Sequence, residues 1–188
     1  MPFKLSKEQW SNVLWILAIV LIVFTPIGFH LKVVLNKLIA TSVDVVKEEN
    51  QMTLENYDWN LVDLEGNRFN FSQNKEQVVL LNFWATWCPP CIAEMPSMVA
   101  LYTDYKDKIV FIFVANDEKD KVLSYLEKKG YELPVYFETT QIPRKFQYNS
   151  IPVTYILSKS GKIVVHEKGA VNWNSKTTRK LLDGLLLE

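Results

Sequence analysis

Only two residues of the chain are cysteines, Cys88 and Cys91, and only two are histidines, His30 and His166. Because both cysteines belong to one short motif, none is left for stabilising disulfides elsewhere or for haem attachment. A closed structural zinc site normally needs four ligands, and the sequence has no second cysteine pair to supply them. We therefore expect an apolar core, without a structural metal or a disulfide framework, to hold the fold together.

The chain also lacks an excess of charge of either sign, since Lys plus Arg and Asp plus Glu both number 21. A protein that binds nucleic acid or another acidic polymer usually carries a basic excess, so the sequence gives no support to such a partner. Hydrophobic residues make up 48% of the chain and aromatic residues 13%. This composition and length suit one domain of about 130 residues with an appendage.

The two cysteines stand where a strand is predicted to lead into a helix. Residues 78–83 are apolar except for Asn82, which is typical of a buried strand, and helical spacing begins at the cysteines. Cys88 then falls at the helix N-cap and Cys91 one turn further on, so the two sulfurs can meet. The helix N-terminus stabilises a thiolate and lowers its pKa. We therefore predict Cys88 as the nucleophile and Cys91 as the resolving cysteine of a reversible disulfide.

Pro89 and Pro90 lie between the cysteines and can occupy the first helical turn, where an N–H group would have no intrahelical partner. They also remove two donors that a Cys88 thiolate could otherwise use, which leaves only the N–H of Cys91 among the three nearest. We expect the pKa of Cys88 to be lowered less than in a motif with a non-proline residue there. This argues against a very strong oxidant.

A second long stretch, residues 13–29, contains no charged residue. As a helix it would extend roughly 26 Å, close to the ~30 Å hydrocarbon core of a bilayer. A cleaved signal peptide would need small residues before a cut site, and none is convincingly placed. We predict a single-pass membrane anchor over 13–29, preceded by a short cytoplasmic tail over 1–12, with a buried soluble helix as the alternative.

Residues 30–56 are predicted to form an amphipathic spacer and a hinge before a domain over 57–188. Apolar residues recur at helical spacing from 31 to 46, among the charged Lys32 and Lys37. This segment could lie on the membrane surface, pair with another copy or continue the anchor helix, and we expect the last. Since lysines lie on both sides of the anchor, charge alone does not fix its orientation.

Residues 83–91 read FWATWCPPC and are followed by Glu94-Met95-Pro96. This long motif resembles the thioredoxin superfamily, and specifically its membrane-anchored TlpA/ResA-like thiol-disulfide oxidoreductases. The resemblance implies an α/β fold, a thioredoxin-like three-layer sandwich with an N-terminal β-hairpin extension. Alternating apolar residues on both sides of Glu65-Gly66-Asn67 also favour such a hairpin.

The same resemblance implies an activity, partners and a location. The Cys88–Cys91 disulfide would be the redox-active group, with no cofactor and no metal. The clients would be disulfide-bearing proteins, with apocytochrome c as one candidate in cytochrome c maturation. Electrons would come from an integral-membrane thiol donor. The domain would face the periplasm or the outside of the cytoplasmic membrane.

The bond before Pro152 is an X-Pro bond, the only kind for which a cis peptide costs little. Thioredoxins carry a cis-proline at the matching place, packed against the cysteines, so the resemblance implies that Pro152 is cis and aligns the backbone of the client. We expect Trp87, Pro89, Pro90 and Ile151 to form the surface on which the client docks.

Asn82 departs from ordinary thioredoxins, which have a buried aspartate at this place to accept the proton of the resolving cysteine. Asparagine cannot act as that base. Glu94 lies one helical turn beyond Cys91 and could take the role of proton acceptor. The alternative is that Glu94 is an exposed helix carboxylate. We expect Trp84, unlike Trp87, to pack in the core.

Other functions of a cysteine pair on this fold remain open. A thioredoxin-like copper chaperone would bind copper through both cysteines and a distant histidine such as His166. Such chaperones have a Cys-x-x-x-Cys spacing, whereas this chain has two residues between its cysteines. A thiol peroxidase would need a Thr-x-x-Cys context, and Thr86 is too close to Cys88. A purely structural disulfide would restrain little chain entropy in so short a loop. Insulin reduction, copper binding and peroxide consumption distinguish these functions.

Overall fold

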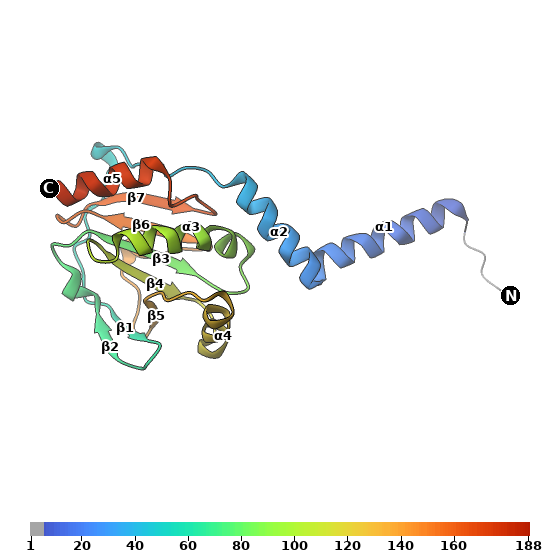
Figure 1. Ribbon diagram of the computed structural model, residues 1–188, viewed down its shortest axis with the longest axis horizontal. Coiled ribbons are helices and arrows are strands. Elements are labelled where there is room, and N and C mark those ends of the chain that lie inside the picture. The colour runs from blue at the N-terminus through green and yellow to red at the C-terminus, as the bar shows by residue number, and fades with distance from the viewer. Residues whose placement is uncertain (1–5) are drawn as a thin grey trace.

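The computed structural model describes residues 6–188, with the side chains of residues 22–24 left aside. Seven strands form one mixed sheet in the order β2-β1-β5-β4-β3-β6-β7 (Figure 1). The α-helices are α1 (Lys7–Phe24), α2 (Pro26–Ile39), α3 (Pro89–Tyr105), α4 (Lys119–Lys129) and α5 (Lys176–Leu187). The strands are β1 (Asn60–Asp63), β2 (Arg68–Asn70), β3 (Val79–Trp84), β4 (Val110–Ala115), β5 (Val135–Glu138), β6 (Val153–Leu157) and β7 (Ile163–Lys168).

β3 lies inside the sheet and is buried along its whole length. It pairs in parallel with β4 and antiparallel with β6. Its side chains alternate between the two faces, so Leu80 and Trp84 join one hydrophobic cluster while Leu81 and Phe83 join the other. Because both faces are covered, the strand is apolar at almost every position, as the sequence predicted.

Among the described residues, α-helices cover one face of the sheet. α3, α4 and α5 all contribute to the cluster that contains Leu80 and Trp84 (Figure 1). In the part of the chain that the structure describes, the opposite face is closed by 3-10 turns and irregular segments, filled by Trp59, Phe71 and Phe146. The expected three-layer sandwich is therefore found only in part: within residues 6–188, α-helices form one outer layer, and the other face is covered by aromatic side chains of connecting segments.

The predicted N-terminal hairpin is present. β1 and β2 pair antiparallel on either side of the turn at Glu65-Gly66-Asn67, where Gly66 has a φ of +92°. β1 also pairs antiparallel with β5, so the hairpin extends the sheet at one edge.

The predicted anchor over 13–29 is not one helix. α1 ends at Phe24 and α2 begins at Pro26, because proline lacks an N–H and disfavours helical backbone at Thr25, whose φ is −108° and ψ 159°. Within residues 6–188, no single helix is long and apolar enough to cross a membrane. The helical segments Lys7–Leu21 and Pro26–Ile39 meet that length and composition requirement only when they are taken together, and their axes differ by 72°. Residues 1–5 of the predicted tail lie outside the described residues.

The segment after α2 lies against the domain, although the sequence predicted a helix over 31–46 and a hinge over 47–56. Val43 and Leu54 are buried. Four backbone hydrogen bonds attach the segment beside β7: Asn172 N to Thr41 O at 2.9 Å, Val46 N to Val164 O at 2.9 Å, Ile163 N to Met52 O at 2.8 Å and Leu54 N to Gly161 O at 2.9 Å. Residues 41–54 therefore pack on the sheet together with the predicted domain, because isolated apolar side chains and backbone groups of the spacer pair with the sheet.

Two truncations test this boundary. A chain that begins at residue 41 should fold as a stable unit. A chain that begins at residue 57 should be less stable, because it loses the burial of Val43 and Leu54, worth about 1.5–3 kcal/mol each, and the backbone bonds beside β7. Urea unfolding of both chains measures the difference. Equal free energies of unfolding would show that the segment contributes nothing, and Leu54→Ala in the longer chain separates side-chain burial from the backbone bonds.

Candidate active site

The two cysteines form a disulfide at the N-terminus of α3, with the Cα atoms 5.3 Å apart. Cys88 is the N-cap residue and Pro89 and Pro90 fill the first helical turn, as the sequence predicted. The backbone N–H of Cys91 points at Cys88 Sγ across 3.3 Å. The helix thus supplies one N–H to this sulfur, in a position where it would stabilise a Cys88 thiolate.

The sulfurs lie just below the surface, beside an exposed indole. Cys88 is 3% exposed and Cys91 0%, whereas Trp87 is 57% exposed. Cys88 Sγ lies 3.6 Å from the carbonyl oxygen of Ile151, and the peptide bond between Ile151 and Pro152 is cis. The structure therefore brings together the cysteines, Trp87 and the cis-proline segment, all of which the sequence had placed in the site.

A cavity of about 450 Å³ lies between Trp87, which precedes Cys88, and Ile151. Its lining consists of Trp87, Asn116, Tyr148, Asn149, Ser150 and Ile151. Trp87 and Ile151 were predicted as docking residues, whereas the polar residues of the lining were not. Asn116 could have been found from the sequence, because residues that follow parallel strands meet at the same edge of a sheet.

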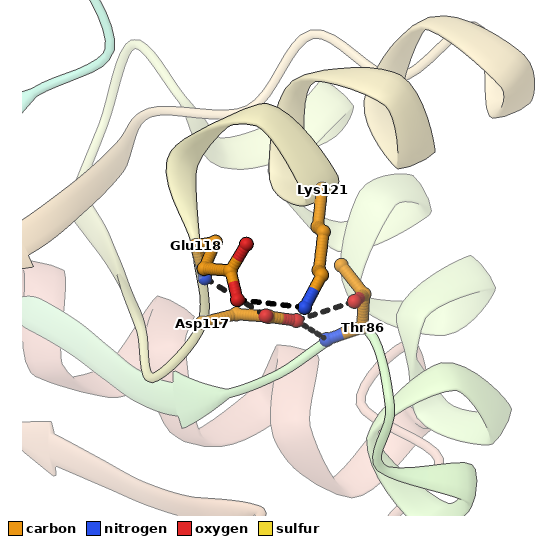
Figure 2. Close-up of polar contacts among 4 residues, drawn as sticks. All are labelled: Thr86, Asp117, Glu118 and Lys121. Atoms are coloured by element: carbon orange, nitrogen blue, oxygen red, sulfur yellow. Dashed lines mark hydrogen bonds and ion pairs between the residues drawn. The ribbon is translucent and has the colours of Figure 1, made fainter.

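Asp117, which follows β4, holds the loop that leads to Cys88 (Figure 2). One carboxylate oxygen accepts hydrogen bonds from the backbone N–H of Thr86, at 3.1 Å, and from the Thr86 hydroxyl. The other accepts from the backbone N–H of Glu118 at 2.8 Å, and Glu118 pairs with Lys121 at 2.8 Å. Asp117 thus fixes the Thr86-Trp87 loop to the N-terminus of α4, a role that the sequence analysis did not assign.

Glu94 is buried on α3, 2% exposed, so the alternative of an exposed helix carboxylate is wrong, whereas its role as proton acceptor stays a prediction. Its Oε1 accepts a hydrogen bond from Asn82 Nδ2 at 3.0 Å. Its Oε2 accepts from Trp173 Nε1 at 2.9 Å and from the backbone N–H of Val171 at 3.2 Å. The carboxyl group therefore joins α3, β3 and the segment after β7, one helical turn beyond Cys91.

Burial raises the pKa of Glu94 to about 8, although the hydrogen bonds from Trp173, Val171 and Asn82 act in the opposite direction. A carboxyl group with this pKa can release and take up a proton near neutral pH. Asn82 itself is fully buried; its Nδ2 also donates to Thr154 Oγ1 at 2.8 Å, and its Oδ1 has no partner. If the Asn82 side-chain amide were flipped, so that its oxygen faced Glu94, a protonated Glu94 could donate a hydrogen bond to it.

His166 lies on β7, where its ring stacks on Tyr155 with the centroids 4.6 Å apart. Burial lowers its pKa. Within residues 6–188, no group of three or more His, Cys, Asp or Glu side chains is arranged to hold a metal ion, so the structure does not bring His166 to the cysteines. The ligand set that a copper chaperone would require is not assembled in this part of the chain.

The buried carboxyl group predicts a pH dependence of stability. Folded Glu94 keeps its proton up to about pH 8, whereas an ordinary glutamate releases it near 4.5, so the folded state binds more protons between these values. The free energy of unfolding of the oxidised protein should therefore fall as pH rises through this window, by a few kcal/mol at most. Glu94→Gln should remove this dependence. Urea unfolding at several pH values measures both proteins. The prediction is contradicted if the free energy of unfolding changes with pH in the same way in wild type and in the variant.

The capping geometry predicts a change in reduction potential. Pro90→His restores a backbone N–H near Cys88 and adds a side chain that can be positively charged, so the thiolate is stabilised and the potential should rise. Equilibration with glutathione measures the shift. Pro96→His is the matched control, because Pro96 is exposed further along the same helix and should leave the potential unchanged. An equal shift in both variants would show that the donor near Cys88 is not the cause.

Comparison with known proteins agrees with this site. The model of the AhpC/TSA family matches residues 52–166, more than half of the chain. The thiol-disulfide oxidoreductase ResA of Bacillus thuringiensis is 34% identical over 143 residues, which cover 74% of this chain and 79% of the relative. The thioredoxin-like protein YneN of Bacillus subtilis is 34% identical over 110 residues, 56% of this chain and 65% of the relative.

Solved structures show the same fold. A candidate thiol-disulfide oxidoreductase from Bacteroides vulgatus matches with a TM-score of 0.58 and 29% identity, over 71% of this chain and 96% of that one. A thiol:disulfide interchange protein from Chlorobium tepidum matches with a TM-score of 0.56 and 24% identity, over 79% and 97% of the two chains, and supports the fold alone. The chain therefore belongs to the AhpC/TSA family of thioredoxin-like proteins and is a thiol-disulfide oxidoreductase.

Proposed function

We propose that the protein reduces disulfides of client proteins outside the cytoplasm, through Cys88 and Cys91. The observation that carries this proposal is the disulfide at the N-terminus of α3, one helical turn from a buried carboxyl group. The exposed Trp87 and the cavity between it and Ile151 offer a docking place for an extended client segment. The names of the curated relatives support the class of reaction.

The exchange proceeds through a mixed disulfide. The Cys88 thiolate attacks a sulfur of the client disulfide, forms a bond to it and releases the other client sulfur as a thiolate. Cys91 then loses its proton and attacks Cys88 Sγ, which closes the disulfide of the protein and releases the second client thiol. Two electrons pass to the client. Glu94 is the proposed acceptor of the Cys91 proton, supported by its place on α3 and a pKa raised to about 8.

The direction of electron transfer, from this protein to the client disulfide, follows from how weakly the site stabilises the Cys88 thiolate. Pro89 and Pro90 carry no N–H, so the Cys91 N–H is the donor that reaches Cys88 Sγ. Asn82, buried behind the disulfide, carries no charge and so adds no positive charge that would stabilise the thiolate. A weakly stabilised thiolate favours the disulfide form of the protein, which makes the reduced form a good electron donor.

The proposal includes a membrane location. The uncharged run 13–29, which is divided between α1 and the first turn of α2, would anchor the chain, with residues 1–12 on the cytoplasmic side and the redox domain on the outer side of the cytoplasmic membrane. The uncharged run and the bent helix pair that meets the length and composition requirement support this location. The electron donor would then be an integral-membrane thiol protein, and apocytochrome c is one candidate client.

Substitution of the resolving cysteine tests the assignment of roles. Cys91→Ser should accumulate mixed disulfides with client proteins through Cys88, because the adduct forms but cannot be resolved. Cys88→Ser should trap none, and it serves as the matched control. Non-reducing electrophoresis and mass spectrometry of the adducts measure the outcome. Adducts through Cys91 in the control, or alkylation of Cys91 before Cys88 in the reduced protein, would overturn the roles.

The reaction class is tested by insulin reduction with a thiol reductant as electron source. The wild-type protein should reduce insulin disulfides, and Cys88→Ser should not. Peroxide consumption or stoichiometric copper binding, without insulin reduction, would favour the peroxidase or the copper chaperone instead.

A further inference from the structure

α2 is attached to the domain beside the redox site. The side chains of Phe29 and Val33 pack against the hydrophobic cluster that contains both cysteines, and Gly28 is buried. α2 lies against α3 at the end of the sheet where β3 leads into α3 (Figure 1). The chain that follows α2 is tied to the segment after β7 by the hydrogen bond from Asn172 N to Thr41 O. The position of α2 relative to the disulfide is therefore fixed at both ends.

The other face of α2 is apolar and exposed. Ile27, Leu31, Val34, Leu35 and Leu38 are each more than half exposed. These five residues recur at helical spacing and form one continuous stripe, which we call the outer stripe. Soluble monomers rarely expose a contiguous apolar patch of this kind, so the outer stripe calls for a partner.

The charges of α2 indicate which partner fits. The helix contains no Asp or Glu, and Lys32 and Lys37 flank the outer stripe. An apolar stripe bordered by lysines is typical of a helix that lies in the membrane interface, where the lysines reach anionic headgroups.

The preceding helix, α1, also favours a membrane as the partner of the outer stripe. Apart from Ala18, all residues from 14 to 21 are apolar and exposed, on every side of α1, so that helix needs apolar surroundings all round. Because the two helices meet at a bend of 72°, α2 can lie near the membrane plane while α1 is inserted in the bilayer, although only the pair together meets the length and composition requirement for a span.

We propose that α2 lies in the membrane interface, with the outer stripe among the acyl chains, and thereby holds the Cys88–Cys91 disulfide at the membrane surface. This inference rests on the membrane location proposed above. It adds an orientation, because α2 is a part of the domain surface rather than an upright spacer. Exchange with disulfides held at the bilayer surface is then faster than exchange with the same disulfides free in solution.

Spin labels on the full-length protein test the orientation. In the oxidised protein both native cysteines are in the disulfide, so a single introduced cysteine can be labelled alone. Ile27→Cys and Leu38→Cys sample the two ends of the outer stripe, Lys37→Cys its flank and Thr103→Cys an exposed position on α3. The protein is reconstituted in vesicles of phosphatidylcholine and phosphatidylglycerol, and the accessibility of each label to oxygen and to a nickel chelate gives its depth.

The labels at 27 and 38 should lie at equal depth, protected from the chelate, while those at 37 and 103 stay accessible. A depth difference approaching the roughly 16 Å between these ends of the helix would identify an upright spacer and overturn the inference. Accessible labels on vesicle-bound protein, or spin–spin broadening between copies across the outer stripe, would overturn it as well. Release of the whole chain from the vesicles would overturn the membrane location and the inference together.

A second experiment measures whether the position of α2 speeds thiol-disulfide exchange at the bilayer surface. The rate of reduction of a disulfide peptide tethered to vesicles is compared with that of the same peptide in solution, for wild type and for the double variant Leu31→Glu/Leu35→Glu. The variant should show a smaller preference for the tethered peptide than wild type, although α1 still anchors it, and should keep the rate on the free one. An unchanged preference would overturn the inference, whereas failure of wild type to reduce either peptide would overturn the proposed function and leave the spin-label result standing.

Discussion

A single carboxyl group, that of Glu94, joins three separate pieces of the chain behind the disulfide. It accepts hydrogen bonds from Asn82 on β3 and from Val171 and Trp173 after β7, while its own backbone belongs to α3. Its burial raises its pKa and lowers the stability of the fold at neutral pH. The same burial gives the protein a group that gains and loses a proton in the pH range in which thiols ionise. The site and the packing of the domain depend on the same contact.

The chemistry at Cys88 reflects two opposing influences. The N-terminus of α3 favours a thiolate, through the macrodipole and the N–H of Cys91. Pro89 and Pro90 withhold two further donors, and the buried residues nearest behind the disulfide add no positive charge. The balance leaves the disulfide form favoured, which is the property of a reductant rather than of an oxidant.

The sequence was sufficient where local patterns decide the structure. The apolar run of β3, the two prolines after Cys88 and the turn at Gly66 predicted the strand, the cap and the hairpin. It failed where distant segments decide: nothing local distinguishes the buried Glu94 from an exposed helix carboxylate, and nothing in residues 41–56 shows that they pair with β7. The break at Pro26 was predictable from the missing N–H, but the long uncharged run around it favoured a continuous span.

The reduction potential of the Cys88–Cys91 pair at pH 7, measured by equilibration against a glutathione buffer, tests the central claim most directly. If the site stabilises its thiolate as weakly as its geometry indicates, the potential should lie nearer to the roughly −270 mV of thioredoxin than to the roughly −120 mV of DsbA. A value above about −180 mV, the potential of protein disulfide isomerase, would contradict the assignment of the protein as a reductant.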